Sequence, residues 1–210
     1  MIRDRRKARL RAASFAALAA AAIMVFVPQV RGQSANAPQY TPTGELQTPT
    51  GFETWVFVGS NLGLGYKDEL KLTTARETAH AQQQVFHNIY IDPQAYAHFV
   101  ATHEFPDPTV LVMEVFTAAD NEPKGIVSKG VFDGDRVGLQ IAVKDSHSPA
   151  KHARDWAYYI PQDVNDPSHP LHASSPAFPD DACESCHQAH ASLDNVWVQF
   201  YPTLRKLTIK

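Results

Sequence analysis

The alternation of hydrophobic and polar residues in the second half of the chain predicts an antiparallel β-sheet. The strongest strand signal is residues 109–116, where alternation divides the side chains between two faces. One face would hold Leu111, Met113 and Val115, and the other Val110, Val112, Glu114 and Phe116. Because both faces are mostly apolar, we expect this strand to lie in the centre of the sheet.

Other segments add strands and a helix around this one. Strands are predicted at residues 85–91 and 156–160, and the apolar run 55–58 fits either a strand or a helix. Asp92 is a suitable N-cap for a helix over residues 93–102, whose first position is a proline.

The remaining segments predict turns and loops. The triplet Asp133-Gly134-Asp135 is typical of a hairpin turn between strands at 125–132 and 136–144. Residues 161–179 are expected to form a long loop, and residues 195–207 a helix that Pro202 interrupts. Together the elements predict an α+β fold dominated by an antiparallel sheet, with a few helices.

The N-terminal residues are typical of a secretory signal peptide. Basic residues between 3 and 11 precede an alanine-rich apolar run over 12–27. We expect a signal peptide at 1–32, cleaved after Gly32 or Ala35, with an uncleaved N-terminal anchor as the alternative. The protein would then be periplasmic, and anchored to the membrane if the segment is not removed.

The charge of the chain changes once this segment is set aside. Seven of the 19 basic residues lie in residues 1–32, so the remainder has a net charge of −9 rather than −3. Scattered cations in a negative domain disfavour nucleic acid as a partner. Residues 33–50 contain three prolines and are expected to form a flexible leader before one globular domain at 51–210.

Both cysteines of the chain lie in one motif, Cys183-Glu184-Ser185-Cys186-His187. The spacing C-x-x-C-H is that of a c-type haem attachment site. Two thiols on one helical turn can each add to a haem vinyl group, and the adjoining histidine can bind the iron from the proximal side. We therefore predict one covalent haem c, held by Cys183 and Cys186, with His187 as the proximal ligand.

Three other interpretations of the motif remain. A disulfide between Cys183 and Cys186 would close a small, strained loop. A thioredoxin-like redox pair would need a βαβ setting, whereas a proline-rich loop precedes this motif. A zinc site could use His187 and His190, but the chain has no second cysteine pair. Haem attachment is favoured because an exported chain uses all of its cysteine in one motif.

Several motifs in the globular part are similar to those of one known family. They are Trp55 to Gly59, Tyr90 to Pro93 with Tyr96 and Phe99, Phe105 to Asp107, Thr109 to Val112, Val143 to Asp145, Trp156 to Tyr159, Cys183 to Gln188 and Gln199 to Pro202. Together they resemble the cytochrome P-460 and cytochrome c′-beta superfamily. The resemblance implies a compact β-rich fold, often dimeric, with one covalent haem c near the C-terminus and a distal pocket built by the sheet.

Two positions depart from the superfamily members that oxidise hydroxylamine. Those members have a lysine bonded to the porphyrin edge where this chain has Met113, and no lysine lies between Lys71 and Lys124. They also have a distal glutamate where this chain has Gln140, which cannot act as a base. Both departures argue against hydroxylamine oxidation.

Met113 has two open roles. It is the only methionine outside residues 1–32, and it is either the sixth iron ligand or an apolar cap over the iron. Gln140 could donate a hydrogen bond to a bound ligand or satisfy the backbone. Glu114, on the opposite face, is expected to be a paired carboxylate rather than a catalytic one. Nine other histidines could compete for the sixth position: His80, His87, His98, His103, His147, His152, His169, His172 and His190.

The sequence thus predicts a periplasmic monohaem c-type cytochrome that transfers electrons or binds a small gas such as nitric oxide. Its partner would be a periplasmic redox protein or the gas itself. The alternative is a haem enzyme that oxidises hydroxylamine or reduces peroxide or nitrogen oxides. A third hypothesis is an exported structural domain with a disulfide. Whether the chain forms a homodimer is left open.

Overall fold

The computed structural model describes residues 36–65, 84–150, 155–163, 168, 170–180 and 182–208. The predicted signal peptide and the first residues of the predicted leader lie outside these ranges. Of the helices in the described residues, none has the length and hydrophobicity of a membrane span.

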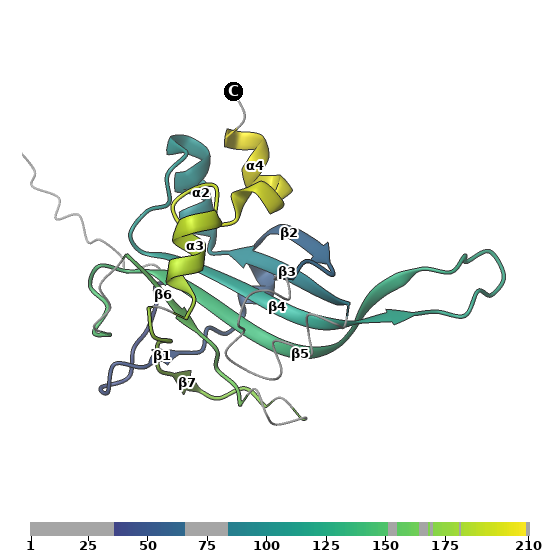
Figure 1. The fold of residues 1–210 in the computed structure, drawn as a ribbon, viewed down its shortest axis with the longest axis horizontal. Helices are drawn as coiled ribbons and strands as arrows, with labels where there is room; N and C mark the ends of the chain where they lie inside the picture. Colours follow the sequence, from purple (N-terminus) through teal and green to yellow (C-terminus); the bar gives the residue numbers. More distant parts are fainter. Residues whose placement is uncertain are drawn as a thin grey trace, which may run out of the picture. The chain divides into compact units, whose positions relative to one another are not determined.

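A five-stranded antiparallel sheet organises the fold (Figure 1). In spatial order its strands are β2 (Val56–Leu62), β3 (Val85–Ile91), β4 (Thr109–Asp120), β5 (Val131–Lys144) and β6 (Trp156–Tyr159). Strands that are consecutive in this sheet also follow one another in the chain, and β4 is the central strand, as predicted.

Short elements complete the fold. Within the described residues the helices are α2 (Pro93–Thr102), α3 (Glu184–His190) and α4 (Pro202–Thr208), with 3-10 helices η1 (Phe52–Thr54) and η2 (Val198–Phe200). A second antiparallel sheet pairs β1 (Leu46–Gln47) with β7 (Ser174–Ser175). The predicted α+β class with a dominant antiparallel sheet is confirmed.

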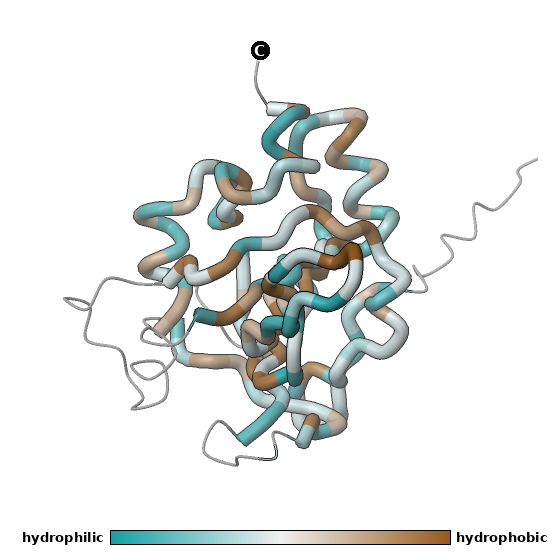
Figure 2. The backbone as a smooth tube through the Cα atoms, turned by 90° about the vertical axis from the view of Figure 1, so that its right-hand side faces the viewer, coloured by the Kyte–Doolittle hydropathy of each residue, from teal (hydrophilic) through white to brown (hydrophobic). Residues whose placement is uncertain are grey.

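The sheet separates two hydrophobic clusters. On the side we call the helix face, sheet residues such as Leu111 and Trp156 pack with Phe99 of α2, Leu204 of α4 and Val198 of η2. The opposite side, the rear face, is covered by the segment that leads into β2. Its buried residues are Leu46, Phe52, Trp55, Val110, Val112, Leu139, Ile141, Val143, Ala157 and Tyr159. In Figure 2 many of the hydrophobic segments accordingly lie towards the centre.

Helix α2 begins as the sequence predicts. The Asp92 carboxylate accepts hydrogen bonds from the backbone N–H groups of Gln94 (3.1 Å) and Ala95 (2.8 Å), and its second oxygen accepts from Val110 N (3.2 Å). One side chain thereby caps the helix and fastens it to the central strand.

The predicted turn at residues 133–135 is wrong. These residues lie inside β5, and the chain reverses direction within residues 121–130, at the end of a long hairpin arm (Figure 1). The register shifts between Phe116 and Ala118, where Asp135 N donates to Thr117 Oγ1 (3.0 Å). A Cβ at position 134 would lie 2.5 Å from that oxygen. Gly134 therefore permits a close approach of two strands at a β-bulge rather than a turn.

Two further expectations differ from the structure. The described part of the leader, residues 36–50, is not free of the domain, because Leu46 is 1 % exposed within the rear cluster and β1 pairs with β7. Pro202 begins α4 instead of interrupting a helix. Proline lacks an N–H and has a fixed φ, and both properties suit the first turn of a helix.

Candidate functional site

The cysteine motif forms the start of α3. Cys183 is the N-cap residue of this helix, and His187 N donates to Cys183 O (3.1 Å). Neither cysteine is part of a disulfide, both are partly buried, and burial raises the pKa of the Cys186 thiol. Because residues three and four apart are neighbours on a helix, the two thiols and the imidazole belong to a single turn.

Two neighbours fix the tautomer of His187. Its Nδ1 lies 2.8 Å from the main-chain oxygen of Asn195, which can only accept, so Nδ1 carries the proton. Its Nε2 lies 3.2 Å from Nε1 of Trp197, which can only donate, so Nε2 has a free lone pair for that bond. Burial lowers the pKa of His187, while the bond to Asn195 raises it. The imidazole is therefore held neutral with its Nε2 as an acceptor, which is the form that binds a metal ion.

The imidazole faces the helix side of the sheet. Its ring lies 4.5 Å from the ring of Tyr158 on β6. Tyr158 is paired with Ala142 on β5, and two residues away Gln140 is paired with Met113 on β4. Directly paired residues point to the same face of a sheet, and a two-residue step along a strand is about 7 Å. Met113, Gln140 and the imidazole thus share the helix face.

The segment after α3 is anchored to the same end of the sheet. Asp194 accepts a hydrogen bond from Lys144 Nζ (2.7 Å) and another from the buried indole N–H of Trp156 (3.2 Å). Both Asp194 and Asn195 have positive φ, 46° and 61°, which Asp and Asn tolerate better than most residues. This turn brings the Asn195 carbonyl and the Trp197 indole to opposite nitrogens of the His187 ring.

Comparison with known families agrees with this arrangement. The family model of Cytochrome P460 matches residues 49–198, which include the sheet, α3 and the anchored segment. The chain belongs to the cytochrome P460 family. No curated protein matches the chain.

A cytochrome P460 chain is a haem-binding protein, and the residues of α3 fit that group. Two thiols outside any disulfide and an imidazole with its lone pair on Nε2 form the donor set of a c-type attachment site. Nε2 has only one lone pair. If this atom bound iron, the bond to iron would replace the hydrogen bond that Trp197 Nε1 donates to it. Cys183, Cys186 and His187 are the residues that would hold the haem.

The predicted distal residues differ in burial. Met113 is partly buried and packs against the helix-face cluster, whereas Gln140 beside it is exposed. Glu114 is buried on the rear face, and its Oε1 lies 3.7 Å from Arg136 Nη1. It is therefore on the opposite side of the sheet from His187 and Met113. Burial raises the pKa of Glu114, and the Arg136 guanidinium lowers it.

Among the residues that the structure describes, the other histidines do not gather around His187. His87 is paired with Val115 and so shares the helix face with Met113, but its Nδ1 lies 2.9 Å from Asn61 Oδ1 on β2. Exposed positions are held by His98, His103, His147, His172 and His190. His80, His152 and His169 lie outside the described residues.

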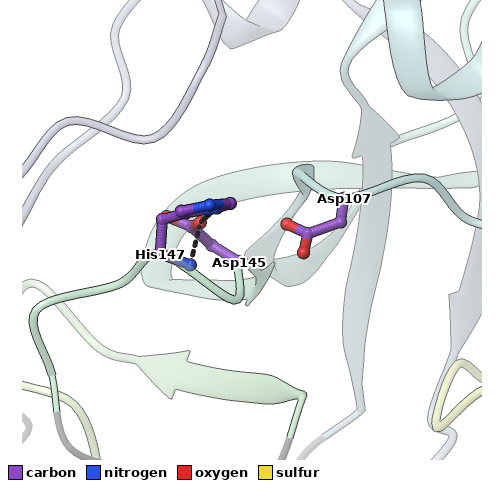
Figure 3. Close-up of side chains that lie close together, drawn as sticks. All are labelled: Asp107, Asp145 and His147. Carbon is purple, nitrogen blue, oxygen red and sulfur yellow. Dashed lines mark hydrogen bonds and ion pairs between the residues drawn. The ribbon is translucent and has the colours of Figure 1, made fainter.

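A second group of metal-binding residue types lies away from α3. Asp107, Asp145 and His147 have ligand atoms within 4.8 Å of one another (Figure 3). Both oxygens of Asp107 accept from Ser146 N (3.2 Å each), and Asp145 Oδ1 accepts from His147 N (2.9 Å). The two carboxylates thus accept hydrogen bonds from the backbone of the turn after β5 and stabilise that turn.

Three contributors to the site were not found from the sequence. They are Asn195 and Trp197, which contact the imidazole, and Tyr158, which packs on it. The pair Asp194-Asn195 is typical of a turn, but the residues of a turn do not predict which side chain will bond to its carbonyl groups.

Proposed function

We propose that this protein is an exported, periplasmic cytochrome that transfers electrons through one haem c. Cys183 and Cys186 would bind the haem by thioether bonds, and His187 would be the proximal ligand. The haem, when bound, supplies a one-electron redox couple. The observation that carries the proposal is the imidazole of His187, held as an Nε2 acceptor above the helix face that also contains Met113.

Met113 is the proposed sixth ligand. Its side chain lies on the helix face and is only partly buried, and it is the only methionine outside residues 1–32. Coordination by histidine and methionine raises the reduction potential and leaves no open iron position. Both properties suit electron transfer to a periplasmic redox partner.

Gln140 favours a second candidate function, the binding of a small gas such as nitric oxide. Its exposed side chain is directly opposite Met113 in the sheet register and has an amide that can donate to a bound ligand. Oxidation of hydroxylamine receives less support, because Met113 and Gln140 stand where the resemblance leads one to expect a lysine and a glutamate.

The absorption spectrum of the reduced protein separates these functions. We expect a six-coordinate, low-spin spectrum that carbon monoxide does not change. Met113→Ala should give a high-spin form that binds carbon monoxide, whereas Leu111→Ala, on the same face, should keep the wild-type spectrum. An unchanged spectrum in Met113→Ala would rule out ligation. Carbon monoxide binding by the wild-type protein would favour the gas-binding function instead.

A further inference from the structure

Glu184 and Asn195 form a connected pair behind His187. Asn195 makes two hydrogen bonds with α3, because its main-chain oxygen accepts from His187 Nδ1 (2.8 Å) and its side-chain Nδ2 donates to Glu184 Oε1 (2.7 Å). Glu184 and His187 are three residues apart on one helix, so they are neighbours on its surface. A single residue of the following turn therefore bridges the carboxylate and the imidazole.

The burial of Glu184 sets it apart within its helix. Its side chain is among the largest fully buried ones, at 1 % relative exposure, while Ser185, Gln188 and His190 of the same helix are exposed. Burying a carboxylate costs several kcal/mol unless hydrogen bonds compensate. A bond from an amide to a charged oxygen is one of the stronger kinds, and its 2.7 Å length agrees with that.

The backbone of Asn195 explains why a side-chain anchor matters there. Its φ of 61° lies in the left-handed region, which asparagine tolerates better than most residues but less readily than glycine. The direction of its carbonyl, and hence the hydrogen bond to His187, depends on that conformation. The hydrogen bond to Glu184 holds Asn195 in place through its side chain, while its main-chain oxygen accepts from His187.

We propose that Glu184 is a positioning residue for the proximal histidine, acting through Asn195. This inference rests on the proposed function, since it assumes that His187 binds the iron. Hydrogen-bond partners of a ligating histidine fix its ring orientation and raise its basicity, and their loss commonly costs 10- to 100-fold in affinity or activity. Loss of the anchor weakens the bond to Nδ1, makes the imidazole a poorer donor to the iron and thus favours the reduced state.

The test uses the haem-loaded, full-length protein and three variants. Glu184→Ala removes the anchor, Glu184→Gln keeps an oxygen that accepts from Asn195, and Asn195→Gly keeps the left-handed backbone and the carbonyl but removes the amide. The readouts are the reduction potential and the electron paramagnetic resonance g-values of the ferric protein, which report the electronic state and the ring orientation. His190→Ala, an exposed residue of the same helix, is the matched control.

We expect Glu184→Ala and Asn195→Gly to raise the reduction potential by similar amounts and to change the g-values in the same direction. The expected shift is about tenfold in the equilibrium constant for reduction, or ~59 mV for one electron. The double variant should show little more than either single variant, because both remove the same link. Glu184→Gln should restore the wild-type g-values, and His190→Ala should match wild type throughout.

Two results would overturn the inference. Wild-type g-values and potential in Asn195→Gly would show that the link has no effect on the histidine, and additive shifts in the double variant would show that the two residues act separately. Should Glu184→Ala fail to fold, Glu184→Gln and Asn195→Gly still decide the question. A wild-type protein without attached haem would instead refute the proposed function, and haem content is therefore measured first.

Discussion

The two faces of the five-stranded sheet differ in how completely the chain covers them. Along β5, Leu139, Ile141 and Val143 point to the rear face and are at most 1 % exposed. The intervening residues point to the helix face, where Gln140 is exposed and Ala142 is only partly buried. The rear face is closed by the chain's own apolar residues, whereas the helix face stays partly open beside His187. Both sides of the sheet carry a hydrophobic cluster, but the proposed haem contacts lie on the side where part of β5 is left uncovered.

Two neighbouring residues of β5 test this difference with the largest expected change in the free energy of unfolding. Leu139→Ala leaves a cavity in the closed rear cluster and should lower the free energy of unfolding by about 2–5 kcal/mol. Gln140→Ala, one residue further on the open face, should change it by less than about 0.5 kcal/mol. Urea unfolding followed by circular dichroism measures both values. Equal losses for the two variants would mean that the faces are covered alike.

Asp194 tests how firmly the segment after α3 is held on the helix face. Asp194→Ala leaves the buried indole N–H of Trp156 and the Lys144 ammonium without this acceptor, and we expect a loss of about 2 kcal/mol. Asp194→Asn keeps an oxygen for Trp156 and tolerates the positive φ, so it should lose roughly half as much. The midpoints of urea unfolding give both losses. Wild-type stability of Asp194→Ala would refute the anchoring role.

Asp92, which caps the helix α2 above the helix face, gives the smallest expected effect. Burial raises the pKa of Asp92, although three backbone N–H groups lower it in part. The folded state therefore binds the proton more tightly than the unfolded chain, so the contribution of Asp92 to stability is present below its ordinary pKa of about 4 and is lost as the pH rises through the folded value. The Asp92→Asn variant has no ionisable group at this position, so its stability should not fall with rising pH for this reason.

The measurement is the difference in unfolding free energy between wild type and Asp92→Asn at a series of acidic pH values. We expect this difference to shift against the wild type as the pH rises through that range. A constant difference, or a shift in favour of the wild type, would contradict the assigned direction.

Local signals in the sequence predict much of this fold. The alternation in residues 109–116 correctly predicts the central strand, and Asp92-Pro93 correctly predicts the start of α2. Both depend on neighbouring residues alone. The wrong predictions concern residues whose structure depends on a contact with a distant part of the chain. Gly134 suits a turn, but it lies against Thr117 of the adjacent strand. Leu46 lies between prolines, yet it packs into the hydrophobic cluster of the rear face.

The candidate site divides in the same way. The motif at Cys183, Cys186 and His187 is contiguous and could be found from spacing. The partners of the imidazole could not, because Tyr158 and Trp197 reach it only through the path of the folded chain. Alternation did predict that Met113 and Glu114 face opposite sides, and the sheet register agrees.

The proposed function requires that the chain bind one haem covalently through its two cysteines. The most direct test is the intact mass of the protein after production with haem-maturation machinery, measured for wild type and for Cys183→Ser with Cys186→Ser. The denatured wild-type chain should retain the added mass of one haem, and the double variant should not. A wild-type mass equal to that of the polypeptide alone would contradict it.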